Sequence, residues 1–215
     1  MPSEALQKFE ANLLVDVDRI IGSHGQLNHE GMGRRGLGHI TRSGVLMLCA
    51  AWELYLEELA LCGGRILVDA ATSPKDLPLA VQKELVRHVK STKHELKPLD
   101  LAGDGWRATY IHHIGDSVAQ LNTPKSANID SMYKRLLGIP DTSRCWSIGA
   151  EEINNFVSAR GDIAHRGRDT NYVTINRLVE YKDAICRTVI ETDNCLADYL
   201  QHDTVVRRSP WRRRR

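Results

Sequence analysis

The chain has 215 residues, of which 42% are hydrophobic and 26% are charged, and its formal net charge is +2. This length and composition are typical of one globular domain that can bury an apolar core. No apolar run reaches the roughly 18 residues of a membrane span, and residues 1–6 lack the basic and apolar blocks of a signal peptide. We therefore expect a cytoplasmic protein that does not enter a membrane.

The positive charge is concentrated near the C-terminus. Residues 207–215 contain six arginines and no acidic residue, so the rest of the chain is mildly acidic. We divide the sequence into a domain of residues 1–203 and an Arg-rich tail of residues 204–215. The simplest interpretation of this tail is a solvated, flexible terminus. The alternative is that its arginines bind phosphates while Trp211 stacks on a base.

Apolar residues three and four positions apart predict helices along the chain. Ser3 is a good N-cap for the first helix, and the glycines at positions 22 and 25 are expected to end it. Gly63 and Gly64 are expected to end the second helix, and Thr174 is expected to begin the last and longest one. The predicted helices cover residues 4–21, 40–61, 78–94, 107–121, 129–137, 149–164 and 174–200.

No segment shows the alternating pattern of a strand, so we predict an all-α fold. The expected architecture is a bundle of about six to seven helices with a long C-terminal helix. The five cysteines are scattered and odd in number, which favours reduced thiols over a disulfide framework or a zinc site. They are Cys49, Cys62, Cys145, Cys186 and Cys195.

An arginine followed five positions later by a histidine occurs four times, so this spacing alone is weak evidence for a site. The pair Arg160 and His165 differs from the others by its place near the end of a predicted helix. On an ideal helix the two side chains would lie about 140° apart around the axis. They converge only if the helix ends or kinks between them, and Gly161 is a residue that permits such a break.

Three segments together resemble the RiboL-PSP-HEPN branch of ribonucleases in the HEPN superfamily. Residues 49–59, Cys-Ala-Ala-Trp-Glu-Leu-Tyr-Leu-Glu-Glu-Leu, resemble the Ala-Trp-Glu helix of this branch. Residues 128–140, which end in Leu-Leu-Gly-Ile-Pro, resemble the short helix before the catalytic helix. Residues 153–167, with Arg-Gly-Asp-Ile-Ala-His-Arg-Gly, resemble the HEPN Arg-x4–6-His motif.

This resemblance implies a HEPN-like helical bundle and a metal-independent endoribonuclease without a cofactor, of the kind found in toxin–antitoxin or phage-defence systems. It implies RNA as substrate and a homodimer in which two Arg/His pairs face each other across a cleft. A cognate antitoxin or a defence-complex protein is the further partner that it implies.

The motif places the catalytic roles on Arg160 and His165. Gly161 stands where the family often has a polar residue, so Asp162 becomes the candidate for an auxiliary role. Glu53, in the Ala-Trp-Glu segment, is either a solvated acid or a second auxiliary carboxylate.

Two further arginines follow the motif histidine. Arg166 and Arg168 are either contacts to the RNA backbone or part of a solvated basic loop.

RNA carries its own nucleophile, the 2′-hydroxyl group, so such a site needs a proton shuttle and cations. A histidine suits the first task and an arginine suits the second. The predicted products are a 2′,3′-cyclic phosphate and a 5′-hydroxyl end. The alternative function is a non-catalytic HEPN-like subunit that binds a protein or a nucleic acid in a defence or regulatory complex.

Overall fold

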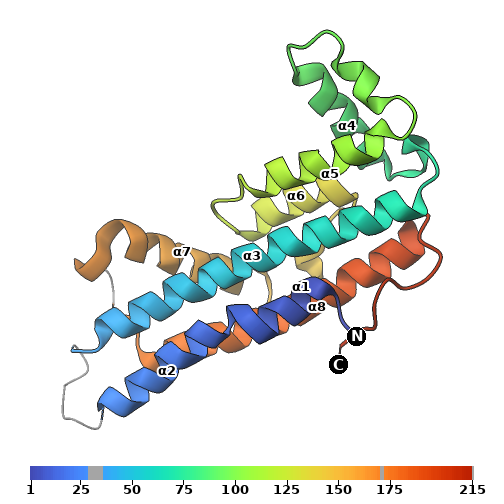
Figure 1. Ribbon diagram of the computed structural model, residues 1–215. Coiled ribbons are helices and arrows are strands. Elements are labelled where there is room, and N and C mark those ends of the chain that lie inside the picture. Colours follow the sequence, from blue (N-terminus) through green and yellow to red (C-terminus); the bar gives the residue numbers. More distant parts are fainter. Residues whose placement is uncertain (29–35, 170–171, 215) are drawn as a thin grey trace.

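The computed structural model describes residues 1–28, 36–169 and 172–214, and in these residues every regular element is helical (Figure 1). The predicted all-α class is therefore confirmed. The elements are α1 (Glu4–Lys8), the π-helical segment η1 (Phe9–Leu13), α2 (Val15–Leu27), α3 (Gly38–Ala70), α4 (Leu79–Ser91), α5 (Gly105–Val118), α6 (Ser126–Leu137), α7 (Ala150–Arg166) and α8 (Ile175–Asp203). Short 3-10 turns join several of them, including η5 (Thr142–Cys145) and η6 (Gly167–Asp169).

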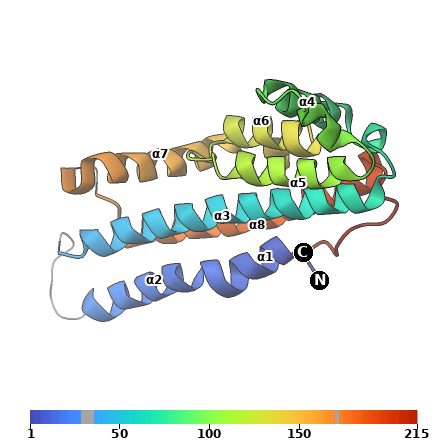
Figure 2. The ribbon, with the colours of Figure 1, turned by 45° about the horizontal axis from the view of Figure 1, so that its top comes forward.

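Helix α3 is the central element of the bundle. It contacts α1, α2, α5, α6, α7 and α8. Figures 1 and 2 show the rod formed by α1 and α2 on one side of α3, and α5, α6 and α7 on another. Its buried stripe includes Trp52 and Tyr55, which are both fully buried, as the sequence predicts.

The predicted helix end at Gly63 and Gly64 is wrong because glycine serves a different purpose there. Helix α3 continues through Gly63 and Gly64 to Ala70, and at 33 residues it is longer than α8, which has 29. A side chain at Gly64 would overlap Ile114, and one at Gly63 would meet Leu137 at 3.2 Å. These glycines therefore let neighbouring helices approach α3 closely, which outweighs their modest cost within a helix.

The first helical rod also extends beyond its expected end. Helix α2 runs through Gly22 and Gly25 to Leu27. A side chain at either glycine would meet no atom within 4 Å, so packing does not explain them. Ser3 and Thr174 are N-caps as predicted, since their hydroxyl groups accept hydrogen bonds from backbone N–H groups one turn later.

The segment before α7 is fixed in the core by Trp146. This side chain is 4% exposed, and its ring lies edge-on to Trp52 at 5.9 Å between ring centroids. Its Nε1–H donates to Thr192 Oγ1 of α8 at 2.8 Å. Since α7 begins four residues later, these contacts determine where the helix with the motif starts.

The prediction of reduced cysteines is wrong for one pair. Cys145 in η5 and Cys195 in α8 form a disulfide across a separation of 50 residues. Cys49, Cys62 and Cys186 are free thiols. The sequence gives no sign of this pairing, because only the packing of η5 against α8 brings the two residues together.

The tail, expected to be flexible, contacts the body of the protein at Val206 and over residues 211–214. Val206 is buried, and the backbone N–H of Arg212 donates to the Met1 carbonyl oxygen at 2.9 Å. The division of the chain at residue 203 stays a prediction. No helix in the described part of the chain is both long and apolar enough to cross a membrane.

Candidate active site

Helix α7 carries the motif and is anchored along one face. Ile153, Phe156, Val157 and Ile163 are buried on that face. The helix follows Gly149, whose φ of 81° is in the left-handed region, and ends at Gly167, with a φ of 56°. The N–H of Gly167 donates to the carbonyl oxygen of Ile163 and closes the last turn.

The expected break at Gly161 does not occur. Helix α7 passes through this residue without interruption and continues to Arg166. A glycine within a helix costs only about 1 kcal/mol. Buried side chains on both sides of it, Val157 before and Ile163 after, hold the helix against the core and offset that cost.

An unbroken helix separates the two motif side chains. Arg160 and His165 lie about 7.5 Å apart along the axis and about 140° apart around it. Arg160 is half-buried on the side of α7 that packs against the core, whereas His165 is exposed. The structure of one chain therefore does not bring the arginine and the histidine together.

Arg160 lies close enough to α3 for its charge to act on two residues of the Ala-Trp-Glu segment. Burial raises the pKa of Glu53, and the nearby Arg160 guanidinium acts in the opposite direction. Burial likewise raises the pKa of the Cys49 thiol to about 12, again partly opposed by Arg160. Glu53 is thus a half-buried carboxylate next to Arg160, and its proximity to that cation was not evident from the sequence.

Asp162 lies on the other side of α7 from Arg160. It is exposed and precedes His165 by three residues, so these two share one side of the helix. Arg166 is exposed in the last turn, where the helix dipole favours a cation. The side chain of Arg168, which belongs to η6, lies outside the described part of the structure.

The other arginines with this spacing have different roles or lie outside the described residues. Arg107 donates two hydrogen bonds to carbonyl groups at the end of α3 and so caps that helix. Arg19 is exposed and pairs with Asp16 on its own helix. Arg34 lies outside the described residues.

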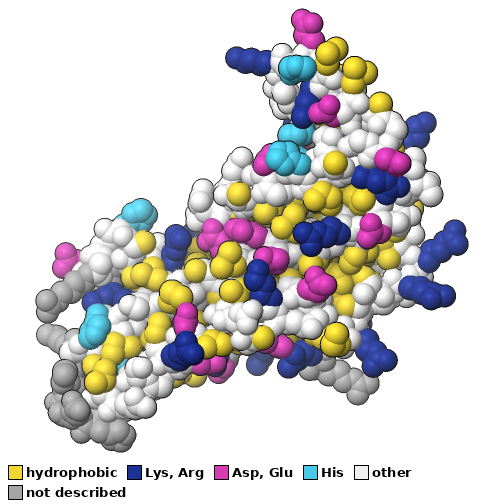
Figure 3. All heavy atoms as spheres, in the orientation of Figure 1, with side chains coloured by type: hydrophobic (Ala, Val, Ile, Leu, Met, Phe, Trp, Pro, Cys, Tyr) yellow, Lys and Arg dark blue, Asp and Glu magenta, His cyan; other side chains and the backbone are white. Residues whose placement is uncertain are grey.

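Sequence reasoning missed an exposed apolar stripe on α3, along residues 46–54. Leu46, Met47 and Leu54 are 37%, 39% and 44% exposed, and Ala50 between them is exposed as well. Hydrophobic side chains lie along this part of the molecule in Figure 3. The sequence does contain a pattern that indicates this stripe. Its apolar residues are three and four positions apart, and they lie outside the buried stripe of the same helix.

Within the described residues no group of three or more His, Cys, Asp or Glu side chains is arranged to hold a metal ion. The catalytic and RNA-binding roles of the named side chains stay predictions.

Comparison with known proteins identifies the family. The RiboL-PSP-HEPN family matches residues 14–198, which include α2 through most of α8 and the whole of α7. No curated protein and no solved structure matches the chain. Because the family match covers most of the sequence, this protein belongs to the RiboL-PSP-HEPN family.

Proposed function

We propose that this protein is a metal-independent endoribonuclease whose active site is shared between two copies of the chain. Membership of a HEPN family supports ribonuclease activity. We infer the shared site from the separation of Arg160 and His165 on one unbroken helix. A second copy supplies the missing half, so that Arg160 of one protomer and the partner's His165 act on the same phosphate.

The exposed stripe of Leu46, Met47, Ala50 and Leu54 supports this arrangement. It lies on the helix that also carries Glu53, the neighbour of Arg160. A second copy that covers these apolar side chains would remove them from water, which favours association.

The chemistry follows from the side chains. The imidazole of His165 removes the proton from the 2′-hydroxyl group and returns a proton to the leaving 5′-oxygen. The planar guanidinium of Arg160 binds the phosphate oxygens as negative charge develops on them. Breaking the bond between phosphorus and the 5′-oxygen leaves a 2′,3′-cyclic phosphate and a 5′-hydroxyl end.

The auxiliary residues have distinct positions in this scheme. Glu53 attracts the Arg160 guanidinium from α3 and limits the directions in which it points. Asp162 lies on the side of α7 that carries His165 and orients that imidazole. Arg166 and Arg168 bind the RNA backbone next to the cleaved bond. We further propose that the protein acts as a toxin or phage-defence effector in the cytoplasm, held in check by a partner protein.

The test is cleavage of end-labelled RNA in excess EDTA by the wild type and by Arg160→Ala and His165→Ala variants. We expect each variant alone to be inactive, and wild-type products to accept phosphate from a kinase without prior phosphatase treatment. Arg19→Ala is the matched control. Because Arg19 is exposed and has no proposed role, this variant should retain full activity. Full activity of either motif variant, or a requirement for a divalent metal, would overturn the assignment.

Mixing the two inactive variants tests the shared site. In a mixed dimer one site contains both substitutions and the other contains neither. Random pairing should therefore restore about a quarter of the wild-type activity. No recovery after mixing, with mixed dimers verified by mass spectrometry, would refute an active site that takes one residue from each copy.

A further inference from the structure

Helix α4 and the segment that follows it, including the 3-10 turn η4 (Lys97–Leu101), project from one end of the bundle (Figure 1). The helix packs on α5 and α6 through an inner face with Val81, Leu85 and Val89, which are all buried. The opposite face of α4 is not covered by any described part of the chain.

This outer face combines apolar and basic side chains in one stripe. At 100° per residue, its four members lie within about 60° around the helix axis. Both kinds of side chain recur after seven residues, so that an apolar residue and a lysine alternate along the stripe. The four exposed residues are Leu79, Lys83, Val86 and Lys90.

The apolar members of this segment are unusually open to water. The three most exposed leucines among the described residues all belong to it: Leu79, Leu96 and Leu99 are 64%, 61% and 65% exposed. Val86 is 44% exposed. Hydrophobic and basic side chains both lie on this projecting end in Figure 3. Apolar groups gathered in this way on a surface mark a site of interaction.

The positive charges of the segment are mostly uncompensated. Of the acidic residues in the range 79–101, Glu84 and Asp100 pair with neighbouring cations, and Glu95 pairs with no described residue. Three exposed lysines form no ion pair within the described chain, namely Lys83, Lys90 and Lys93. The segment is therefore basic, although the body of the protein is mildly acidic.

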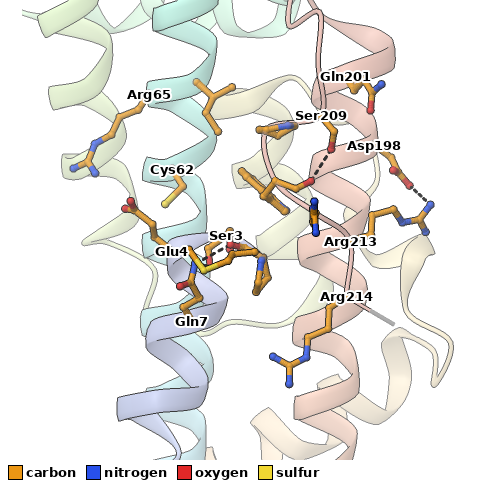
Figure 4. Close-up of a pocket in the computed structure, with 16 residues that line it drawn as sticks. Ser3, Glu4, Gln7, Cys62, Arg65, Asp198, Gln201, Ser209, Arg213 and Arg214 are labelled. Atoms are coloured by element: carbon orange, nitrogen blue, oxygen red, sulfur yellow. Dashed lines mark hydrogen bonds and ion pairs between the residues drawn. The ribbon is translucent and has the colours of Figure 1, made fainter.

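The Arg-rich tail is the other basic segment, and it differs from α4. Its Trp211 packs against the core, Arg213 pairs with Asp198 at 3.1 Å, and Arg214 pairs with Glu10 (Figure 4). The tail lines a cavity of about 1330 Å³ together with the N-terminal residues, α3 and α8. It thus offers cations without the exposed leucines found on α4 and after it.

The chemistry of the stripe favours a protein over RNA or a lipid surface. Single-stranded RNA binds to cations and aromatic rings, which gives no role to Leu79 and Val86. In a helix that lies on a bilayer the lysines stand on the polar face, whereas on α4 they lie inside the apolar stripe. A partner helix can match both kinds of side chain, because helices that pair in a seven-residue repeat set apolar residues against each other and acidic residues beside lysines.

We propose that the outer face of α4 binds an acidic amphipathic helix of a partner protein. Apolar side chains of that helix cover Leu79 and Val86, and its carboxylates pair with Lys83 and Lys90. The 13 residues of α4 span about 20 Å, which is enough for about two such repeats. The inference does not depend on ribonuclease activity, because neither Arg160 nor His165 belongs to this face.

Site-specific photocrosslinking tests the proposal. The photoreactive residue benzoylphenylalanine replaces Leu79 in the full chain, which is then produced in its native cells and irradiated. Mass spectrometry identifies the crosslinked peptides. We expect one protein segment that is rich in Asp and Glu and has apolar residues three and four positions apart. Crosslinks only to RNA, only to lipid, only to a second copy of this chain or to nothing overturn the proposal.

The crosslinked segment, made as a synthetic peptide, is then titrated against the purified chain. The double variant Lys83→Glu/Lys90→Glu should bind it at least tenfold more weakly, because like charges then oppose each other. A peptide with lysines in place of its acidic residues should bind this variant better than it binds the wild type. Both lysines are exposed, so the variant should fold, which circular dichroism verifies.

Arg187→Glu is the matched control. Arg187 is an exposed cation of α8 that forms no ion pair with a described residue, and α8 does not pack on α4. This variant should bind the peptide as tightly as the wild type does. Equal affinity of the wild type and the double variant, or a loss of affinity as large in the control, overturns the proposal.

Discussion

Asp193 is a buried acid whose effect on stability can be measured against pH. Its side chain is fully buried in α8, and the Ser3 hydroxyl group donates to its Oδ1. Its Oδ2 has no hydrogen-bond partner among the described residues. Burial raises the pKa of Asp193 to about 6, in spite of the opposing hydrogen bonds from Ser3, and the charge of Glu10 raises it further.

The sign of the effect follows from the two pKa values. The pKa in the folded protein, about 6, lies above the ordinary value of 3.8, so the folded state favours the neutral acid. This preference stabilises the fold fully below pH 4 and is lost as the pH rises through about 6. A difference of about two pH units between these pKa values corresponds to about 3 kcal/mol of unfolding free energy.

The Asp193→Asn substitution removes the titration and keeps the shape of the side chain. We expect the variant to be more stable than the wild type by about 1–3 kcal/mol at pH 8, because no charge is buried. At pH 4, where the wild-type carboxyl group is already neutral, the variant should show no such gain.

Urea unfolding followed by circular dichroism at pH values from 4 to 8 measures this difference. Asp69→Asn, which removes an exposed carboxylate of α3, is the control and should change stability little at any of these pH values. A constant difference between Asp193→Asn and the wild type over the whole pH range would refute the reasoning.

Two further predictions concern local structure. Gly138→Ala should destabilise the protein by about 2–3 kcal/mol in urea unfolding, because Gly138 ends α6 at a φ of 87° and a Cβ atom would overlap Pro78. Gly115→Ala, within α5 and with open space around the new Cβ atom, should instead be neutral or stabilising, and equal effects of the two would contradict this explanation. Adding dithiothreitol should lower the unfolding free energy by about 4 kcal/mol, the value for a disulfide loop of about 50 residues, and Cys195→Ser should abolish this response. A thiol titration that finds all five cysteines free without reductant would contradict the pairing with Cys145.

Most of the fold could be predicted because local patterns and packing agree. The apolar stripes placed α4, α5, α6 and α7 near their observed positions, and the N-caps of the first and last helices were correct. The errors in helix ends fell on glycines within α2 and α3, and close packing explains only those in α3. A glycine that ends a helix and one that lets a neighbouring helix approach are identical in sequence, and only the neighbour distinguishes them.

The candidate site was only half predictable for a similar reason. The order of the three motifs favoured Arg160 and His165 among four pairs with the same spacing, and their catalytic roles stay a prediction. It was not sufficient to show that α7 is continuous, because buried residues on both sides of Gly161 determine that outcome. The position of Glu53 beside Arg160 depends on the packing of α7 against α3, which connects residues more than 100 positions apart.

By itself, the sequence determined the helical class and the family, because these depend on periodicity and on local order along the chain. The choice of Arg160 and His165 as the catalytic residues stays a prediction. The tertiary structure alone decided which residues meet. It separated Arg160 from His165 within one chain, paired Cys145 with Cys195, and folded the Arg-rich tail over a cavity at the far end of the bundle. Such contacts arise from the close packing of distant segments around α3, and no local pattern encodes them.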